Sequence, residues 1–234
     1  MATKLSVELA IKTGHRLHIL HLTSGIEADY LADYCTLPSK AEQHPIITTE
    51  VLPQHLTFDE TDVDEQGVRL QMNPPIRYAA DREILWARLR DGTIQCIATD
   101  HAPHTLENKA KGFPNAHSGM PGVETSLPVM LTNVNDGNCS LEDVVRWMST
   151  DVADCYQMIG KGKLEVGYDG DIVLVDMAAK AVVEDKNSWT RVGWNPFRGR
   201  ELTGWPVLTV VDGIPVFERS PVTGQKGRLL VEPG

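Results

Sequence analysis

Four polar side chains follow four short strand-like stretches, and their residue types are those that bind metals or transfer protons. They are His21 at the end of "RLHILHL", His55 after "PIITTEVL", Asn73 after "GVRLQM" and Asp100 after "TIQCIAT". Two neutral imidazoles and a carboxylate form a ligand set that suits Zn²⁺ and leaves positions for water. Zinc bound in this way supplies hydroxide near neutral pH, and a nearby carboxylate can transfer a proton. We therefore predict a metal-dependent hydrolytic site containing His21, His55 and Asp100.

Each of these residues also has a structural interpretation. A histidine in an apolar strand is commonly a hydrogen-bonded core residue, and Asp100 could cap a turn. His18 and His21 lie three apart on one predicted strand, so their side chains point to opposite faces. We choose His21 for the site because it lies nearer the carboxyl end. We interpret His101 either as a residue that supports the ligands from behind or as a structural residue. The ligands are too far apart in sequence for a local zinc motif, so the prediction depends on strands that converge.

The elements that would position these residues alternate between strand and helix. The predicted strands cover residues 16–22, 45–52, 67–72 and 93–99. Helices are predicted at 3–13, from Ser24 onward with Glu27 completing a capping box, and across 77–92. Alternation of this kind predicts parallel strands with helical crossovers, in a doubly wound sheet or a (β/α)8 barrel. Both folds place their chemistry at the carboxyl ends of the strands.

The pattern changes in the second half of the chain. Helices are predicted at 122–134, at 140–150 with Ser140 and Asp143 as its cap, and at 151–160. From about residue 163 the sequence is β-rich, with a turn at Asp212-Gly213. We therefore predict two parts, a partial barrel carrying the catalytic rim (1–162) and a small β-rich module (163–234).

Composition excludes some classes of partner. The chain has 234 residues and a formal net charge of −10, which argues against nucleic acid and anionic membranes as partners. Its apolar runs are too short to span a bilayer, and its N-terminus lacks a secretory pattern. The four cysteines form no CxxC pair, which predicts reduced thiols in a cytoplasmic protein.

Several motifs together resemble those of dihydroorotases in the amidohydrolase superfamily. They are "LHILHLTS" (17–24), "LPQHL" (52–56), "MNPPIR" (72–77), "ATDHAPH" (98–104), "GDIVLVD" (170–176) and "NPFRGRELTGWPVLTVVDGIPVFE" (195–218). The resemblance implies an α/β fold, namely the C-terminal half of a (β/α)8 hydrolase barrel with a small β module. It also implies zinc-assisted, reversible ring opening of dihydroorotate to N-carbamoyl-L-aspartate in de novo pyrimidine biosynthesis.

The same resemblance assigns roles to individual residues. His21 and His55 would bind one zinc of a binuclear pair, and Asp100 would bind the other and act as general base and acid. Asn73 and His104 would bind the substrate, His104 through the substrate carboxylate. Gly119, in "HSGMPG", would bring its backbone close to the substrate, beneath a loop formed by residues 105–118.

The sequence also departs from the family pattern. Dihydroorotases carry an HxH pair and a bridging lysine carbamate or aspartate, and this sequence has no HxH. A closed barrel needs eight strands, and only four βα strands are predicted here. We therefore expect an incomplete second metal site and a chain that is inactive alone. An N-terminal half or a second copy of the chain would be its partner.

Two alternatives remain open at this point. One is a non-catalytic remnant or scaffold that pairs with a full dihydroorotase or another pyrimidine enzyme. The other is a cyclic amidase of the hydantoinase or allantoinase type. Asn73 and His104 favour dihydroorotate over the substrates of those enzymes, since both are expected at the substrate carboxylate and ring.

Overall fold

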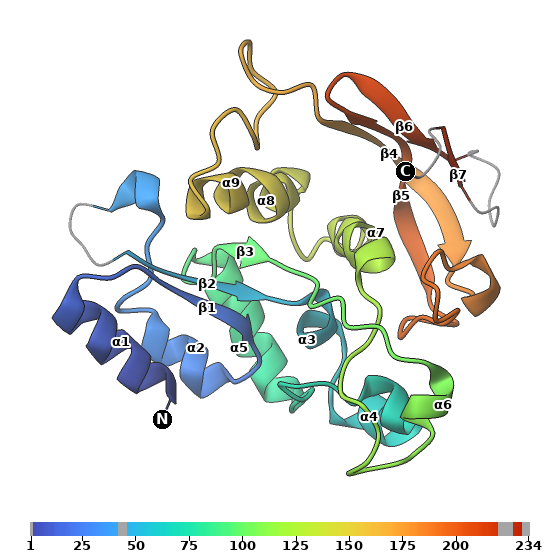
Figure 1. The fold of residues 1–234 in the computed structure, drawn as a ribbon, viewed down its shortest axis with the longest axis horizontal. Coiled ribbons are helices and arrows are strands. Elements are labelled where there is room, and N and C mark those ends of the chain that lie inside the picture. Colours follow the sequence, from blue (N-terminus) through green and yellow to red (C-terminus); the bar gives the residue numbers. More distant parts are fainter. Residues whose placement is uncertain (1, 42–45, 220–226, 231–234) are drawn as a thin grey trace.

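Two sheets of different type organise the chain in the computed structural model, which describes residues 2–41, 46–219 and 227–230. The first is parallel and consists of β1 (Leu17–Leu22), β2 (Ile47–Val51) and β3 (Cys96–Ile97), with β2 in the middle. The second is antiparallel and consists of β4 (Ile172–Val182), β5 (Glu201–Val211), β6 (Ile214–Glu218) and β7 (Arg228–Leu229). Figure 1 shows the two sheets on either side of helix α7 (Val123–Asn135).

The register of the parallel sheet brings the carboxyl ends of its strands to one edge. Leu22 pairs with Val51, and Val51 pairs with Ile97. All five residues of β2 are buried, as expected for a central parallel strand. Three of the four predicted strands are therefore confirmed in type and direction. Pro45, at the start of the second predicted strand, lies outside the described residues.

The prediction of a strand at 67–72 is wrong. This segment forms a 3₁₀ helix, η2 (Gly67–Leu70), directly after helix α4 (Glu60–Gln66). Two prolines follow at 74 and 75, and neither has an N–H to donate to a neighbouring strand. Leu70 and Met72 are buried there without a strand partner. Asn73 therefore lies in a connecting segment and not at the end of a strand.

Helices cover both faces of the parallel sheet. Figure 1 shows α1, α2 and α5 on one side of the strands and α8 and α9 on the other. The bounds of the helices are α1 (Ala2–Thr13), α2 (Gly25–Leu31), η1 (Pro38–Lys40), α3 (Pro53–Thr57), α5 (Ala79–Arg90), α6 (Leu106–Lys109), α8 (Leu141–Val145), the π-helical η3 (Arg146–Thr150), α9 (Asp151–Cys155) and η4 (Asp185–Asn187). The predicted helices at 3–13, 77–92 and 122–134 are confirmed within a few residues.

The two predicted helix caps have different outcomes. Ser140 and Asp143 form a complete capping box at the start of α8. Helix α2 also begins after its predicted cap, Ser24, but the Ser24 side chain makes no capping hydrogen bond. Instead Asp81 accepts the backbone N–H of Gly25 at 2.7 Å, and Glu27 accepts from the Thr3 hydroxyl. Contacts with distant residues therefore take the place of the predicted capping box at α2.

The β-rich part begins later than predicted. Strand β4 starts at Ile172, and the residues before it form turns. The hairpin between β5 and β6 turns at Asp212 and Gly213, both with positive φ (51° and 74°), as a type I′ turn requires. This turn was predicted correctly from the Asp-Gly pair.

Two large hydrophobic clusters stabilise the fold. The first lies around the parallel sheet and includes Val51, Leu89 and Trp147. The second joins residues near the first sheet, such as Phe58 and Leu70, to residues of the C-terminal part, such as Trp194. Within it, Phe58 stacks on Phe197 with ring centroids 4.8 Å apart. A boundary at residue 162 stays a prediction, since this second core joins residues from both sides of it.

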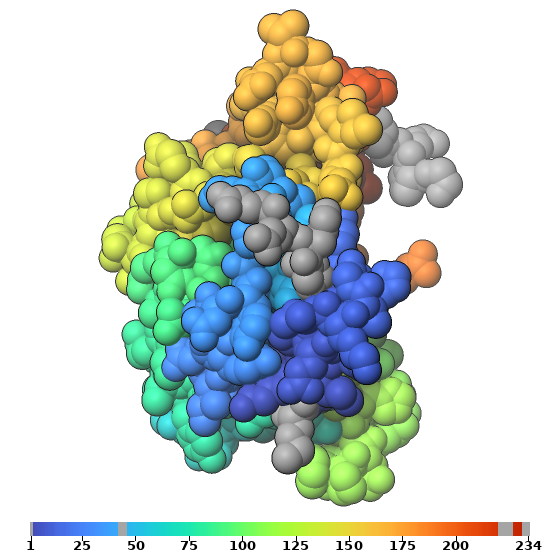
Figure 2. All heavy atoms as spheres, turned by 90° about the vertical axis from the view of Figure 1, so that its left-hand side faces the viewer, coloured from blue at the N-terminus to red at the C-terminus, as the bar shows by residue number. Residues whose placement is uncertain are grey.

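One segment extends away from the rest of the surface. Figure 2, viewed from the side of α1 and α2, shows residues near 157–171 at the top of the molecule. Its apolar side chains are exposed, with Ile159 at 97% and Leu164 at 77% of full exposure. Among the described residues, no helix is long and apolar enough to cross a bilayer.

Candidate active site

Backbone strain marks the carboxyl edge of the parallel sheet at two of the predicted ligands. His21, at the carboxyl end of strand β1, has φ +39°, and Asp100, just beyond β3, has φ +42°. Residues other than glycine rarely adopt this region, and such strain concentrates at functional sites. Both side chains are partly accessible. His21 is the next-to-last residue of β1, and Asp100 follows the end of β3 by three residues. β1 and β3 are the two outer strands of the sheet and their ends are aligned through β2, so both backbones lie on the same rim.

His55 is placed on α3, immediately after β2. Its side chain is 3% exposed, and its Nε2–H donates to the Pro74 carbonyl at 3.2 Å. Burial lowers its pKa to about 4, and the nearby charges of His21 and Arg77 act in the same direction. The ring is therefore neutral at pH 7. Its second nitrogen, Nδ1, is buried with no hydrogen-bond partner, so its lone pair is free to bind a metal.

The three predicted metal ligands are not drawn together into a closed site. In the described ranges, no group of three or more His, Cys, Asp or Glu side chains is placed to hold one metal ion. The residues therefore fit a metal only in part. His55 offers an unpartnered imidazole nitrogen, and His21 is close enough to influence its pKa.

The segment that contains Asn73 is fixed to the rim by its neighbours. The carbonyl of Pro74 accepts from His55, and the carbonyl of Pro75 accepts from the Thr23 hydroxyl at 2.6 Å. Asn73 itself is exposed. The "MNPP" segment thus reaches the same edge as His21 and His55, although it is not a strand.

Two predicted substrate-binding residues, His104 and Gly119, are brought together. Gly119 has φ +127°, and a Cβ there would lie 2.7 Å from the Ala102 Cβ and carbonyl oxygen and 3.4 Å from the His104 ring. Only glycine fits this position. His104 Nε2 lies 3.1 Å from the Ser118 carbonyl, and its ring meets His117 edge-on. The two ends of the 105–118 segment are therefore adjacent.

Lys109 holds this segment in place, and sequence reasoning did not identify it. The side chain is 1% exposed, and its Nζ donates to the carbonyls of Gln71 (2.6 Å), His117 (3.1 Å) and Gly119 (3.0 Å). Burial lowers its pKa to about 8. In the sequence it is one lysine in the polar stretch "LENKAK", so no local signal separates it from a surface residue.

His101 has a structural role, which is one of the two interpretations that the sequence left open. Its Nδ1 accepts the backbone N–H groups of Gly122 (3.1 Å) and Val123 (3.3 Å) at the start of α7. These N–H groups have no acceptor within the helix, so His101 acts as a cap.

The C-terminal part also supports the rim. Trp194 is buried, and its Nε1–H donates to the His104 carbonyl at 2.7 Å. Glu124 on α7 accepts the backbone N–H groups of Trp189 and Thr190 at 2.7 and 2.6 Å. The position of His104 therefore depends on residues about 90 positions away in the chain.

A cavity of about 540 Å³ lies elsewhere, between α5, α7 and the start of β5. Its three arginines already have acceptors: Arg82 donates to Asp59, Arg90 to the Asn138 carbonyl and Arg200 to Asp62. None of these three guanidinium groups is therefore without an acceptor.

Comparisons with known proteins agree with the motifs and the fold. Residues 7–216 match the model of the amidohydrolase family. The dihydroorotase of Geobacillus thermodenitrificans is 36% identical over 91% of this chain and 48% of its own length. The dihydroorotase of Halobacterium salinarum is 34% identical over 97% of this chain and 51% of its own length.

Solved structures show the same fold. The L-hydantoinase (dihydropyrimidinase) of Arthrobacter aurescens superposes with a TM-score of 0.87 at 32% identity, over 99% of this chain and 49% of that one. The dihydropyrimidinase of Brevibacillus agri gives a TM-score of 0.82 at 26% identity, over 92% of this chain and 47% of that one. The chain spans about half the length of the curated relatives it matches. The resemblance drawn from the motifs is confirmed, and the fold is that of the α/β metal-dependent hydrolases: the chain belongs to the amidohydrolase family.

Proposed function

We propose that the chain carries one half of the active site of a dihydroorotase-type hydrolase. The reaction is the reversible ring opening of dihydroorotate to N-carbamoyl-L-aspartate in pyrimidine biosynthesis. The observation that best supports it is the placement of His104 against Gly119, beside a rim with strained residues at His21 and Asp100. The dihydroorotase relatives support the choice of substrate.

His21, His55 and Asp100 are the proposed zinc ligands. Zinc would supply a Lewis acid for the amide carbonyl and hydroxide at neutral pH. His55 is neutral, as a coordinating imidazole must be, and its Nδ1 lacks another partner. Because the described residues form no closed set of three ligands, further ligands from a complementary segment would complete a binuclear site.

Asp100 is the proposed proton shuttle, and Asn73, His104 and Gly119 the proposed substrate contacts. A carboxylate at the rim can accept a proton during attack on the amide and return it to the leaving nitrogen. His104 can donate to the substrate carboxylate, and Gly119 allows the backbone to approach the ring without a Cβ in the way. Lys109, through its three carbonyl acceptors, keeps these contacts together.

A hydantoinase-like cyclic amidase is the second candidate. The observation that favours it is the structural match to the Arthrobacter aurescens L-hydantoinase. The two substrate classes differ in the ring carboxylate, which dihydroorotate has and simple hydantoins lack. His104 would matter for the first substrate and much less for the second.

The partner is proposed to be a complementary amidohydrolase segment that supplies the HxH pair, or a second copy of this chain. Two kinds of surface are proposed for such a partner. One is the pair of edge strands of the parallel sheet, β1 and β3, and the other is the set of exposed apolar residues near 157–171. A cytoplasmic location is part of the proposal, and the four free cysteines support it.

The deciding experiment measures zinc content and dihydroorotate hydrolysis of the purified chain. The chain is assayed alone and after mixing with the N-terminal half of a dihydroorotase. We expect activity and stoichiometric zinc only in the mixture. Hydrolysis of hydantoin but not dihydroorotate by the mixture would select the second candidate. Inactivity with both substrates, in a complex shown to have formed, would instead favour the non-catalytic scaffold.

A further inference from the structure

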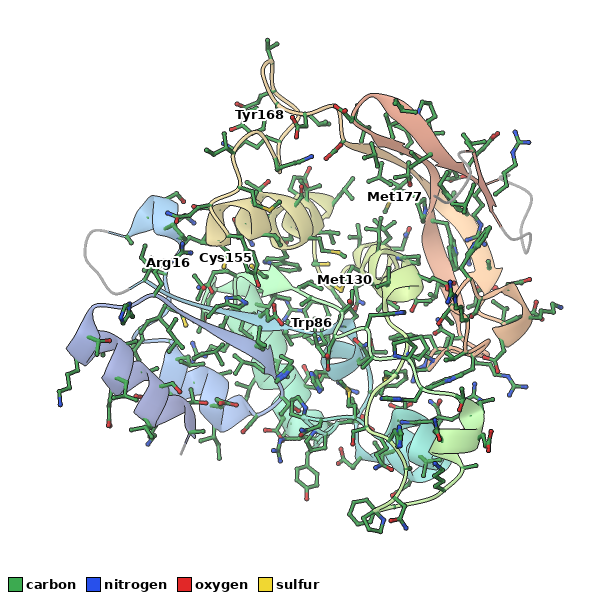
Figure 3. All side chains as sticks on the ribbon, viewed as in Figure 1. Arg16, Trp86, Met130, Cys155, Tyr168 and Met177 are labelled. Carbon is green, nitrogen blue, oxygen red and sulfur yellow. The ribbon has the colours of Figure 1, made fainter. Side chains whose placement is uncertain are left out.

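A second cluster of reactive side chains lies between the parallel sheet and α9, away from the carboxyl rim. Cys155, on α9, lies with its Sγ 3.5 Å from His18 Nδ1 and 3.2 Å from Thr48 Oγ1. His18 Nε2 lies 3.1 Å from a Glu50 carboxylate oxygen. Figure 3 places Cys155 at the side of α9 that faces the strands, with Arg16 beside it. Arg16 donates to the backbone carbonyl of Cys155.

Glu50, His18 and Cys155 are arranged in the way that activates a thiol. A carboxylate orients an imidazole, and the imidazole faces a sulfur. Although burial opposes protonation, hydrogen bonds with Cys155 and Glu50 raise the pKa of His18 to about 9. Hydrogen bonds with Cys96, His18 and Thr48 lower the pKa of Cys155 well below its ordinary value, against the effect of burial. Both shifts favour the form in which a Cys155 thiolate pairs with a His18 imidazolium.

A second thiol lies against the first. Cys96, on β3, packs with Cys155 in a small cluster that also contains Leu37, and both cysteines are 2% exposed. The hydrogen bond to Cys155 and burial raise the pKa of Cys96, so Cys96 stays protonated. A low-pKa thiol beside a second cysteine is the arrangement of a thiol that oxidises to a disulfide.

A metal site does not explain this cluster. Across the part of the chain that the structure describes, no three His, Cys, Asp or Glu side chains are placed to hold a metal ion. A large substrate is excluded as well, because Cys155 is buried. The His18 side chain is 18% exposed, so the cluster is not wholly removed from solvent.

We propose that Cys155, His18, Glu50 and Cys96 form a peroxide-reactive redox site. The Cys155 thiolate attacks the O–O bond of a hydroperoxide, which gives Cys155 sulfenic acid and an alcohol or water, with the proton supplied by His18. The Cys96 sulfur then attacks the Cys155 sulfur and forms a disulfide. The hydroxyl leaves as water with the Cys96 proton. The disulfide would join α9 covalently to β3.

The other two cysteines provide internal controls. Burial raises the pKa of Cys35 to about 12 and that of Cys139 to about 11, so neither is a thiolate at neutral pH. The titratable and charged groups near Cys155 are His18, Cys96, Cys35, Asp151, Tyr156 and Arg16, and Glu50 lies against His18.

The test is oxidation of the purified chain with hydrogen peroxide at pH 7, followed by thiol counting in denaturant and peptide mapping without reduction. We expect the free thiols to fall from the four present to a pair, with Cys96 linked to Cys155. Cys155 should react at least about tenfold faster than Cys139, since burial raises the pKa of Cys139 to about 11 and keeps it protonated at pH 7. Cys96→Ser should stop the reaction at a Cys155 sulfenic acid that dimedone traps.

His18→Gln should slow the oxidation of Cys155 by about tenfold, and Cys139→Ser should leave it unchanged. Equal rates for Cys155 and Cys139 in the unmodified chain would overturn the proposal, and that comparison needs no variant to fold. A disulfide that joins Cys35 to either cysteine of the cluster would overturn it equally.

Discussion

Lys109 Nζ lies 3.0 Å from the carbonyl oxygen of Gly119, a residue whose position has no room for a side chain. The same ammonium also binds the carbonyls of Gln71 and His117. Three segments that come from different parts of the chain thus meet at one buried charge. The geometry of the proposed substrate contacts depends on that charge.

Lys109→Met should lower the free energy of unfolding by about 2–4 kcal/mol. The methionine fills the space but leaves three carbonyls without their donor. Denaturant unfolding followed by fluorescence measures the change. The matched control is Lys111→Met on an exposed lysine that binds only the Asn108 side chain, and it should change stability by less than about 0.5 kcal/mol. Equal effects of the two substitutions would contradict this role for Lys109.

The stability of the chain should rise between about pH 8 and 10.5 because of Lys109. Burial lowers its folded pKa to about 8, so above that pH the folded state binds fewer protons at this site than the unfolded state. Stability therefore increases with pH, by at most about 1.4 kcal/mol per unit. Below pH 8 both states are protonated and the contribution is flat. Lys109→Met should remove this rise when its unfolding curves are compared with those of the parent chain across that range.

Gly119→Ala should destabilise the chain by about 3 kcal/mol. The new Cβ would overlap Ala102 at a φ of +127° that side chains rarely adopt. Gly137→Ala is the control, because Gly137 also has positive φ (+78°) but has open space around it. We expect a cost of only about 1 kcal/mol there. Thermal unfolding of the two variants should separate steric overlap from backbone strain.

Asp100→Asn should reduce the turnover of a reconstituted enzyme by at least about 100-fold, since the amide cannot accept a proton. Asparagine tolerates positive φ, so the backbone at +42° should be kept. Asp212→Asn is the control, an aspartate at φ +51° in the β5–β6 turn, and should retain full turnover. Normal turnover of Asp100→Asn would remove Asp100 from proton transfer.

The parallel strands and most helices could be predicted because their signals are local. Ile47–Val51 is β-branched and apolar enough to identify a buried strand, and Asp212-Gly213 is sufficient to predict its turn. The 67–72 segment could not be identified in this way. Its alternating pattern is typical of a strand, but a strand also needs a partner, and the prolines that follow remove the donors that would pair with one.

The sequence predicts a site residue when its type and its place at a strand end are enough to identify it. It does not predict a residue whose position is determined by contacts with distant parts of the chain. His21 and Asp100 lie at the carboxyl ends of their strands, as the sequence predicts, and their roles stay predictions. Lys109 and the Cys155–His18 pair depend on contacts between distant segments. His18 was set aside in favour of His21 because the two point to opposite faces. That reasoning left open what His18 contacts, because Cys155 lies 137 positions further along the chain.

The second hydrophobic cluster, in which Phe58 stacks on Phe197 and Leu70 and Trp194 share one buried core, has a consequence for unfolding. Without the antiparallel part, Phe58 and Leu70 would be exposed to solvent. Without the part that contains the parallel sheet, Trp194 and Phe197 would be exposed. Heating should therefore melt both sheets in a single cooperative transition, with equal calorimetric and van't Hoff enthalpies. A fragment that stops at residue 162 should behave as a molten globule that binds hydrophobic dyes.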